Sequence, residues 1–475
     1  MIAWIPLLSL AFAGAPDRSA APVIPPSTPL TLPTETVETV RPGVRIHWLP
    51  VAGVRRVEVE VRLGRGGLWL DGSGTPADDL TGSLWTVAAK GWSASKLEQA
   101  ASLEDLAMSA TVGLRTTIVS MSVPRDGLDR GLDLFDTVLH APTYPGAEVS
   151  RSIADNVQNW TTGVPTDPQS LAWLADQSAW YPAADPRSPR PDLDALRAVK
   201  SGDLRSRQQR LLTSAPVDVV VVGDVDPAKL RSQIVALLDG VGADVPAADP
   251  LPPRAAGVTA VIGVDVPGAD QAILSLRTIA PLRGAPEQTA MEAIQFAIGG
   301  QFLSRLNKNL REEKGWTYGG YSDYDANTDE SSWAFHVQVA EENVGASILE
   351  IQKELARMAD GGVHADEKAA GLMGSVAAWN VTLESASSAR GALDDLIAHG
   401  ETLDVARARL DEASALDLST TGPLARATLL SGDHVWVIVG DRAHIEAQLP
   451  DLVGAAVWLT PAQVTAGNVT VERAP

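Results

Sequence analysis

Alternating apolar and polar residues predict several β-strands in this chain. Between residues 54 and 63 valine or leucine alternates with arginine or glutamate, and the same period of two returns at 117–123 and 333–339. A period of two places successive side chains on opposite faces, so each segment predicts a strand with one face in the core and the other in water. Residues 217–222, which are mostly valine, predict a strand that is buried on both faces.

Segments with helical spacing follow these strands. They cover residues 126–139, the region around 151–160, 226–238 and 444–449. Ile348, Ile351, Leu355 and Met358 mark the core face of another helix, which the Gly361-Gly362 pair ends. Strands with one polar face, interspersed with helices, predict an α+β fold in which antiparallel-rich sheets are covered by helices on one side.

One unit occurs twice. The buried strand at 217–222 ends in Gly223-Asp224, and the strand at 435–439 ends in Gly440-Asp441, 217 residues later. Such a repeat predicts two related half-domains, which we place at residues 37–245 and 255–465, joined by a Pro/Ala-rich linker at 246–254. A chain of 475 residues is long enough for each half to have its own core.

Composition narrows the possible functions. A net charge of −21 argues against nucleic acid or an anionic membrane surface as a partner, and the absence of cysteine excludes disulfides and thiolate chemistry. The apolar run at residues 1–13 ends in Ala-Phe-Ala and predicts a cleaved signal peptide in preference to a buried strand, followed by a Pro-rich tether at 14–36. No other run is apolar enough to span a bilayer. We therefore expect a periplasmic or secreted protein.

The segment 303–318 reads Leu-Ser-Arg-Leu-Asn-Lys-Asn-Leu-Arg-Glu-Glu-Lys-Gly-Trp-Thr-Tyr. Leucines at 303, 306 and 310 predict an amphipathic helix that ends at Gly315, with Arg311 in its last turn and Tyr318 just beyond it. Both side chains donate hydrogen bonds, so together they could hold a peptide carbonyl or stabilise an oxyanion. By spacing alone, the simpler interpretation is an arginine that balances the helix dipole and a tyrosine that opens a strand.

These residues, with their surroundings, resemble the C-terminal half-domain signature of the insulinase-like (pitrilysin, inverted-zincin) metallopeptidase family. The signature is carried here by Gly299-Gly300, Ser304-Arg305-Leu306, Leu310-Arg311-Glu312, Gly315 and Tyr318. The resemblance covers roughly residues 37–459 and implies the duplicated half-domains of that family. It also implies that Arg311 and Tyr318 help to hold a peptide substrate.

The same resemblance points to a missing metal site. The family carries His-x-x-Glu-His on a helix of its first domain, where the histidines bind zinc and the glutamate acts as the base. In register with Lys90-Gly91, the corresponding positions are Gly82, Trp85 and Thr86, which do not supply these ligands. No acidic residue lies between Asp155 and Asp167 to provide the third ligand. Trp85 either fills the vacated space or is an ordinary core residue.

No replacement metal site is evident in the sequence. The seven histidines stand at 47, 140, 336, 364, 399, 434 and 444, and no two of them are four residues apart. His364, Asp366 and Glu367 form the nearest cluster, which a solvated loop after Gly362 explains better. We therefore expect no metal or other cofactor in this chain. The resemblance implies that zinc is held by a partner subunit, since in several families of this kind one of two unlike subunits carries the zinc motif.

The leading hypothesis is an exported, non-catalytic insulinase-like subunit. It would form a heterodimer with a zinc-bearing subunit and contribute Arg311 and Tyr318 to peptide binding. A second hypothesis is a pseudoenzyme with a scaffolding or peptide-capture role and no part in proteolysis. A third, an active peptidase with unfamiliar ligands, would need a zinc site that the histidine spacing does not offer.

Overall fold

The computed structural model describes residues 30–72, 75–189, 192–245, 251, 254, 257–450 and 456–469. The predicted signal peptide and most of the predicted linker lie outside these residues. None of the described helices combines the length and apolar character needed to cross a membrane.

The first half contains a six-stranded sheet with the order β1-β2-β6-β3-β5-β4. Only β2 and β6 run parallel, and the other neighbours are antiparallel. The strands are β1 (Thr36–Arg41), β2 (Val44–Pro50), β3 (Arg56–Leu63), β4 (Ala107–Val112), β5 (Thr117–Pro124) and β6 (Val217–Gly223). Helices that contribute to this half are α1 (Gly67–Asp71), α2 (Pro76–Trp85), α3 (Ala94–Leu103), α4 (Leu128–His140), α5 (Gly146–Gln158), α6 (Pro168–Trp180), α7 (Leu193–Ala198), α8 (Ser201–Ser214) and α9 (Pro227–Leu237).

The second half contains a sheet with the order β12-β7-β11-β8-β10-β9. Its strands are β7 (Thr259–Asp265), β8 (Gln271–Ile279), β9 (Gly320–Asp325), β10 (Ser332–Ala340), β11 (His434–Gly440) and β12 (Val457–Leu459). Its helices are α10 (Gln288–Ile298), α11 (Arg305–Asn307), α12 (Val344–Gly361), α13 (Ala365–Thr382), α14 (Ala386–Ala398), α15 (Leu403–Ala415), α16 (Thr421–Leu429), α17 (Arg442–Ile445) and α18 (Pro461–Thr465).

Short 3-10 and π turns join several of these helices. The 3-10 turns are η1 (Arg125–Gly127), η3 (Val164–Thr166), η5 (Glu341–Asn343), η6 (Leu418–Thr420) and η7 (Glu446–Gln448). The π turns are η2 (Asn159–Gly163) and η4 (Lys308–Glu313). The C-terminal helix predicted at 444–449 is therefore α17 followed by a 3-10 turn.

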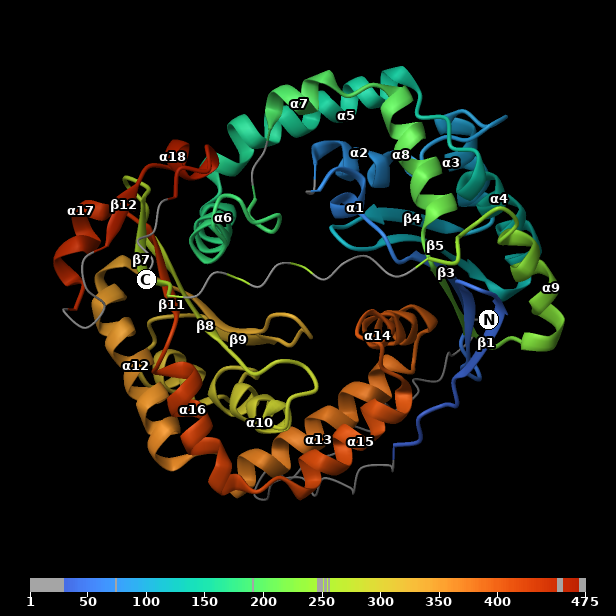
Figure 1. The fold of residues 1–475 in the computed structure, drawn as a ribbon. Helices are drawn as coiled ribbons and strands as arrows, with labels where there is room; N and C mark the ends of the chain where they lie inside the picture. The colour runs from blue at the N-terminus through green and yellow to red at the C-terminus, as the bar shows by residue number, and fades with distance from the viewer. Residues whose placement is uncertain are drawn as a thin grey trace, which may run out of the picture.

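The two sheets share one plan. In each, a parallel pair (β2 with β6, β7 with β11) is followed by antiparallel neighbours, and an edge strand (β4 or β9) closes the order. This arrangement confirms the predicted fold class of two antiparallel-rich sheets covered by helices. The domain boundaries remain a prediction, because helices pass from each half to the other. Figure 1 shows the ribbon as a ring, with the sheets on opposite sides and α5, α7, α13 and α15 between them.

Each sheet is covered on one face by helices of its own half and on the other by a helix of the opposite half. Helix α6 of the first half packs on the second sheet, where Leu171, Leu174 and Ala175 join the valines of β11 in one apolar cluster. Helix α14 of the second half packs on the first sheet, where Leu393 and Leu396 meet β2 and β6. Figure 1 shows both helices on the inner side of the ring.

The predicted half-buried strand at residues 54–63 is therefore wrong in one respect. Its polar face is not in water, because α14 covers it, and Glu58, Glu60 and Arg62 are all less than 10% exposed. Arg390 of α14 pairs with Glu60 and lies 3.5 Å from Glu58, and Arg62 pairs with Asp394. Buried charges require such partners.

The second sheet has a buried pair that matches the Arg62–Asp394 pair of the first. Asp176 of α6 lies 2.6 Å from Arg277 of β8, the strand that corresponds to β3. Burial raises the pKa of Asp176, and the Arg277 guanidinium opposes that rise. Each crossing helix is therefore held by apolar contacts together with a buried arginine–carboxylate pair.

Candidate functional site

Helix α2 carries Gly82 and Trp85, two of the positions predicted to correspond to the metal motif, and it is packed directly against strand β4 at Gly82. A Cβ atom at this position would lie 2.8 Å from the backbone nitrogen of Val112 and 3.0 Å from the Cα of Thr111. Real Cβ atoms do not approach backbone this closely, so no larger side chain fits without moving the strand. An imidazole at residue 82 therefore has no room.

The other two motif positions have different surroundings. Trp85 is fully buried in the first core, and its indole N–H donates to the carbonyl oxygen of Leu139 at 3.4 Å. Trp85 is thus a core residue. Thr86 follows the last residue of α2 and lines a cavity of about 660 Å³ together with Leu97 and Met108. Neither residue could serve as the general base or as an imidazole ligand.

The region expected to hold the third ligand is helical and lacks acidic residues after Asp155. Helix α5 continues into a π turn at Asn159–Gly163, and the next carboxylate, Asp167, caps α6 by accepting from the backbone N–H of Ser170. Within the part of the chain that the structure describes, no three His, Asp or Glu residues are grouped so that they could hold a metal ion. The residues of this half do not fit a zinc site.

His364 and Asp366 are exposed, as the sequence suggested, but the cluster opens a helix and does not lie wholly in a loop. His364 is the N-cap of α13, and its backbone N–H donates to Glu367 at 2.8 Å. Glu367 also receives two hydrogen bonds from Arg305, which hold its pKa below the usual range against the effect of burial. The cluster joins a helix start to the signature segment.

The signature segment is helical from Arg305 to Glu313, first as the short helix α11 and then as a π turn. Leu306 and Leu310 are buried as predicted, but Leu303 precedes the helix and is 57% exposed. The helix ends before Gly315, whose φ of +68° lies in the left-handed region that favours glycine. The end point and the place of Arg311 in the last turn agree with the sequence prediction.

Arg311 is partly buried, with Nη1 enclosed and without a hydrogen bond, and its contacts are local. Its guanidinium carbon is 3.9 Å from the centre of the Phe302 ring, and Nη1 is 3.0 Å from a carboxylate oxygen of Glu312. The Phe302 ring is itself half-exposed, so the stacked pair forms part of the outer surface. Stacking on an aromatic face leaves the edge of a guanidinium available for hydrogen bonds to a ligand.

Tyr318 projects away from the fold and is 92% exposed. It follows Gly315 in the turn before β9 and shares no hydrogen bond with Arg311 among the described residues. The two predicted site residues are thus near in sequence and both accessible, but they are not in contact. The structure does not test their predicted role.

Two asparagines, which the sequence analysis missed, fix this segment. The side-chain oxygen of Asn307 accepts from the backbone N–H of Gly320 at 2.8 Å, and Asn309 donates to Glu354 of α12. Both asparagines are almost fully buried. The sequence did offer one sign of this anchoring, because two asparagines lie on the inner side of a short helix and buried amides need hydrogen-bond partners. Asn307 holds the helix against the first residue of β9, and Asn309 holds it against α12.

Strand β9 is the edge of the second sheet, since it pairs only with β10. An edge strand presents unpaired backbone N–H and carbonyl groups that can pair with an extended peptide. Gly299 allows α10 to approach this strand, because a Cβ there would lie 2.7 Å from the hydroxyl of Ser322. The site thus combines an edge strand, exposed Tyr318 and Tyr321, and the Arg311–Phe302 pair.

Comparison with known proteins agrees with this geometry. Residues 198–371 match the family model described as the peptidase M16 inactive domain. A comparison with curated proteins gave no match.

Several solved structures share the fold. A peptidase M16 inactive domain from Pseudomonas fluorescens is 16% identical, with a TM-score of 0.76 and coverage of 86% of this chain and 98% of that one. A protease from Helicobacter pylori is 17% identical, with a TM-score of 0.74 and coverage of 86% and 100%. The first half of the periplasmic protease PqqL from Escherichia coli is 16% identical, with a TM-score of 0.71 and coverage of 91% and 95%.

The chain therefore has the two-sheet fold of these structures, and its first half has Gly82, Trp85 and Thr86 at the positions predicted for the metal motif. The predicted resemblance to the insulinase-like (M16) family is confirmed by the inactive-domain match over residues 198–371 and by these structures.

Proposed function

We propose that this chain is a non-catalytic subunit that pairs with a zinc-bearing insulinase-like subunit and contributes Arg311 and Tyr318 to peptide binding. The observation that carries the proposal is the exposure of Tyr318, a phenol that is 92% accessible beside an edge strand. Because Tyr318 is almost fully exposed, its side chain is available to a ligand or to a neighbouring subunit. The packing of Gly82 against β4 supports the non-catalytic part of the proposal.

Export to the periplasm or outside the cell is part of the same proposal. It rests on the apolar run at residues 1–13, which lies outside the described residues, and on the Pro-rich segment after it. PqqL, one of the proteins with this fold, is described as periplasmic.

The first experiment measures hydrolysis of a quenched fluorescent peptide and zinc content for the chain alone, its zinc-bearing partner alone, and the mixture. We expect cleavage to require both chains, with the zinc in the partner. Zinc and cleavage in the lone chain would show that the interpretation of Gly82, Trp85 and Thr86 is wrong.

Substitutions then test the role of the two residues in the complex. Arg311→Ala and Tyr318→Phe each remove donors that could stabilise charge on the substrate, and loss of one such donor typically lowers turnover by about 10²–10³-fold. Lys308→Ala is the matched control, because Lys308 is an exposed cation in the same turn. Unchanged turnover in an intact Arg311→Ala complex would exclude the proposed role.

The local contacts of Arg311 favour one alternative. Its stacking on Phe302 and its ion pair with Glu312 are interactions that a purely structural arginine would make. A scaffolding or peptide-capture pseudoenzyme predicts that Arg311→Ala lowers the stability of the lone chain and leaves hydrolysis by the mixture unaffected.

A further inference from the structure

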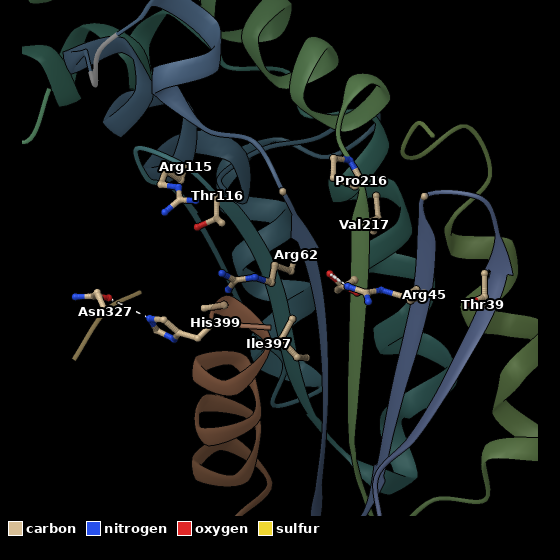
Figure 2. A pocket seen from close by; sticks show the side chains of 14 residues that line it. Thr39, Arg45, Arg62, Arg115, Thr116, Pro216, Val217, Asn327, Ile397 and His399 are labelled. Carbon is tan, nitrogen blue, oxygen red and sulfur yellow. Dashed lines mark hydrogen bonds and ion pairs between the residues drawn. The ribbon is translucent and has the colours of Figure 1, made fainter. Parts of the chain in front are cut away.

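A cavity of about 610 Å³ lies where the two halves meet, at one end of the first sheet. The first half supplies Arg62 at the end of β3 and Arg115 with Thr116 in the turn between β4 and β5. The second half supplies Asn327, which follows β9, and His399 at the end of α14. Figure 2 shows Arg62, Arg115 and His399 directed toward one region between these elements.

Arg62 offers unused hydrogen-bond donors to this cavity. Its side chain is only 9% exposed, and its one protein partner is Asp394, which accepts from Nη1. A guanidinium has five N–H donors, and Nε and Nη2 of Arg62 have no acceptor among the described residues. Neither nitrogen is among the fully enclosed atoms without a partner, so both are accessible, and Arg62 lines the cavity.

Arg115 is in a similar position. Its Nη1 donates to Asp329 at 3.0 Å, which links the β4–β5 turn to the second half, and its other nitrogens have no partner in the described chain. On the opposite wall, Nε2 of His399 lies 3.0 Å from the side-chain oxygen of Asn327. Two guanidinium groups with free donors thus face one space.

Asp218, a carboxylate that lines the cavity, already accepts hydrogen bonds from other residues. Asp218 receives two hydrogen bonds from Arg45, at 2.7 and 3.0 Å, and a third from His47 at 3.0 Å. These contacts keep the pKa of Asp218 below its usual range even though burial raises it. Asp218 therefore does not neutralise Arg62 and Arg115, whose remaining donors are left for an anionic acceptor from outside the chain.

We propose that this cavity binds a peptide carboxylate, from either an acidic side chain or a C-terminus. The planar fork of an arginine matches a carboxylate, and two arginines with free donors can hold both of its oxygens. The volume lies in the range of small-ligand sites. Because the walls come from both halves, a bound carboxylate would contact both. The proposal goes beyond pairing with a zinc-bearing subunit and does not depend on it.

The test uses the lone mature chain and fluorescein-labelled decapeptides of Ala, Ser and Gly. One peptide carries a central Glu and an amidated C-terminus, a second carries Gln with the amide, and a third carries Gln with a free C-terminal carboxylate. Fluorescence anisotropy should show tighter binding of the first or third peptide than of the second, and the better of the two identifies the source of the carboxylate. Inorganic phosphate serves as the competing anion.

Arg115→Gln and Arg62→Gln should each weaken binding of the preferred peptide by roughly tenfold, because each removes a charge-assisted hydrogen bond. The control is Arg125→Gln, which removes another arginine of the first half, one that pairs with Asp224 outside the cavity. Circular dichroism checks the fold of Arg62→Gln, and Arg115 is more exposed, so its variant keeps the test valid if Arg62→Gln unfolds. Equal binding of all three peptides, no binding at millimolar concentration, or binding of phosphate without any peptide preference would overturn the proposal.

Because the lone chain is assayed, failure of the proposed subunit pairing cannot produce these negative results. Conversely, loss of carboxylate binding in Arg115→Gln leaves Arg311 and Tyr318 untouched, so the two proposals fail separately.

Discussion

At the scale of single residues, Gly82 lies where no larger side chain fits, so this predicted metal-motif position has no space for an imidazole. Helix α2 and strand β4 meet at a distance that only a glycine allows. Restoring histidine by substitution would therefore require the strand to move. The sequence shows that residue 82 is not a histidine, but it does not show how little space surrounds this residue. That space is limited by β4, a strand that comes later in the chain.

The consequence can be measured with two glycine-to-alanine substitutions in helices. In an open helix interior, alanine is more favourable than glycine by about 1 kcal/mol. A Cβ added at Gly391 in α14 would meet no atom within 4 Å, so Gly391→Ala should stabilise the protein by up to that amount. Gly82→Ala should instead destabilise it by roughly 1–3 kcal/mol. Urea denaturation of both variants decides the matter, and stabilisation by Gly82→Ala would refute the close packing.

His47 predicts a pH dependence of stability. Burial alone would lower its pKa, but hydrogen bonds to Asp218 and Glu35 outweigh burial and raise it above the usual 6.5. A raised pKa means that the protonated ring stabilises the fold fully below about pH 6.5 and that this contribution is lost as the pH rises through the folded-state pKa. The difference in unfolding free energy between the native chain and His47→Gln should therefore be larger at pH 6 than at pH 8. The same difference at both values would show that the ring does not titrate as stated.

At the scale of elements, the strands and helices were largely predictable from sequence, but their surroundings were not. Alternation correctly predicted β3, β5 and β10, and the repeated Gly-Asp pairs correctly predicted the ends of β6 and β11. The same alternation wrongly placed Glu58 and Glu60 in water. A polar strand face predicts contact with solvent, and only the folded structure shows that a helix distant in sequence covers it. The signature helix was predicted, whereas its anchoring through Asn307 depends on contacts that spacing does not encode.

Burial of these charges predicts the effect of removing their partner. Arg390→Met should destabilise the protein by about 3–5 kcal/mol, because Glu58 and Glu60 would be left buried without a cation. Adding Glu58→Gln and Glu60→Gln should recover part of the loss. Arg407→Ala in α15, which breaks an exposed pair with Asp404, should change stability by less than about 1 kcal/mol. Equal effects of Arg390→Met and Arg407→Ala in denaturation experiments would contradict the buried network.

At the scale of the whole molecule, the two halves complete each other's cores. The first sheet without α14 would expose the apolar side chains that now meet Leu393 and Leu396. We therefore expect residues 30–245 expressed alone to bind a hydrophobic dye and to aggregate. Co-expression with residues 257–475 should restore a soluble complex. A monomeric first half that unfolds cooperatively would show that the halves fold independently.

The two carboxylates on β3, which have no counterpart on β8, have a consequence for how the chain finds one structure. Since the sheets share a strand order, α6 and α14 face equivalent apolar surfaces, and apolar contacts alone would let either helix cover either sheet. Helix α6 carries no lysine or arginine, so on the first sheet it would leave Glu58 and Glu60 buried without a cation, and β8 carries no carboxylate to pair with Arg390. Glu58, Glu60 and Arg390 therefore favour one arrangement, because only when α14 lies on the first sheet does each of these three charges meet its opposite.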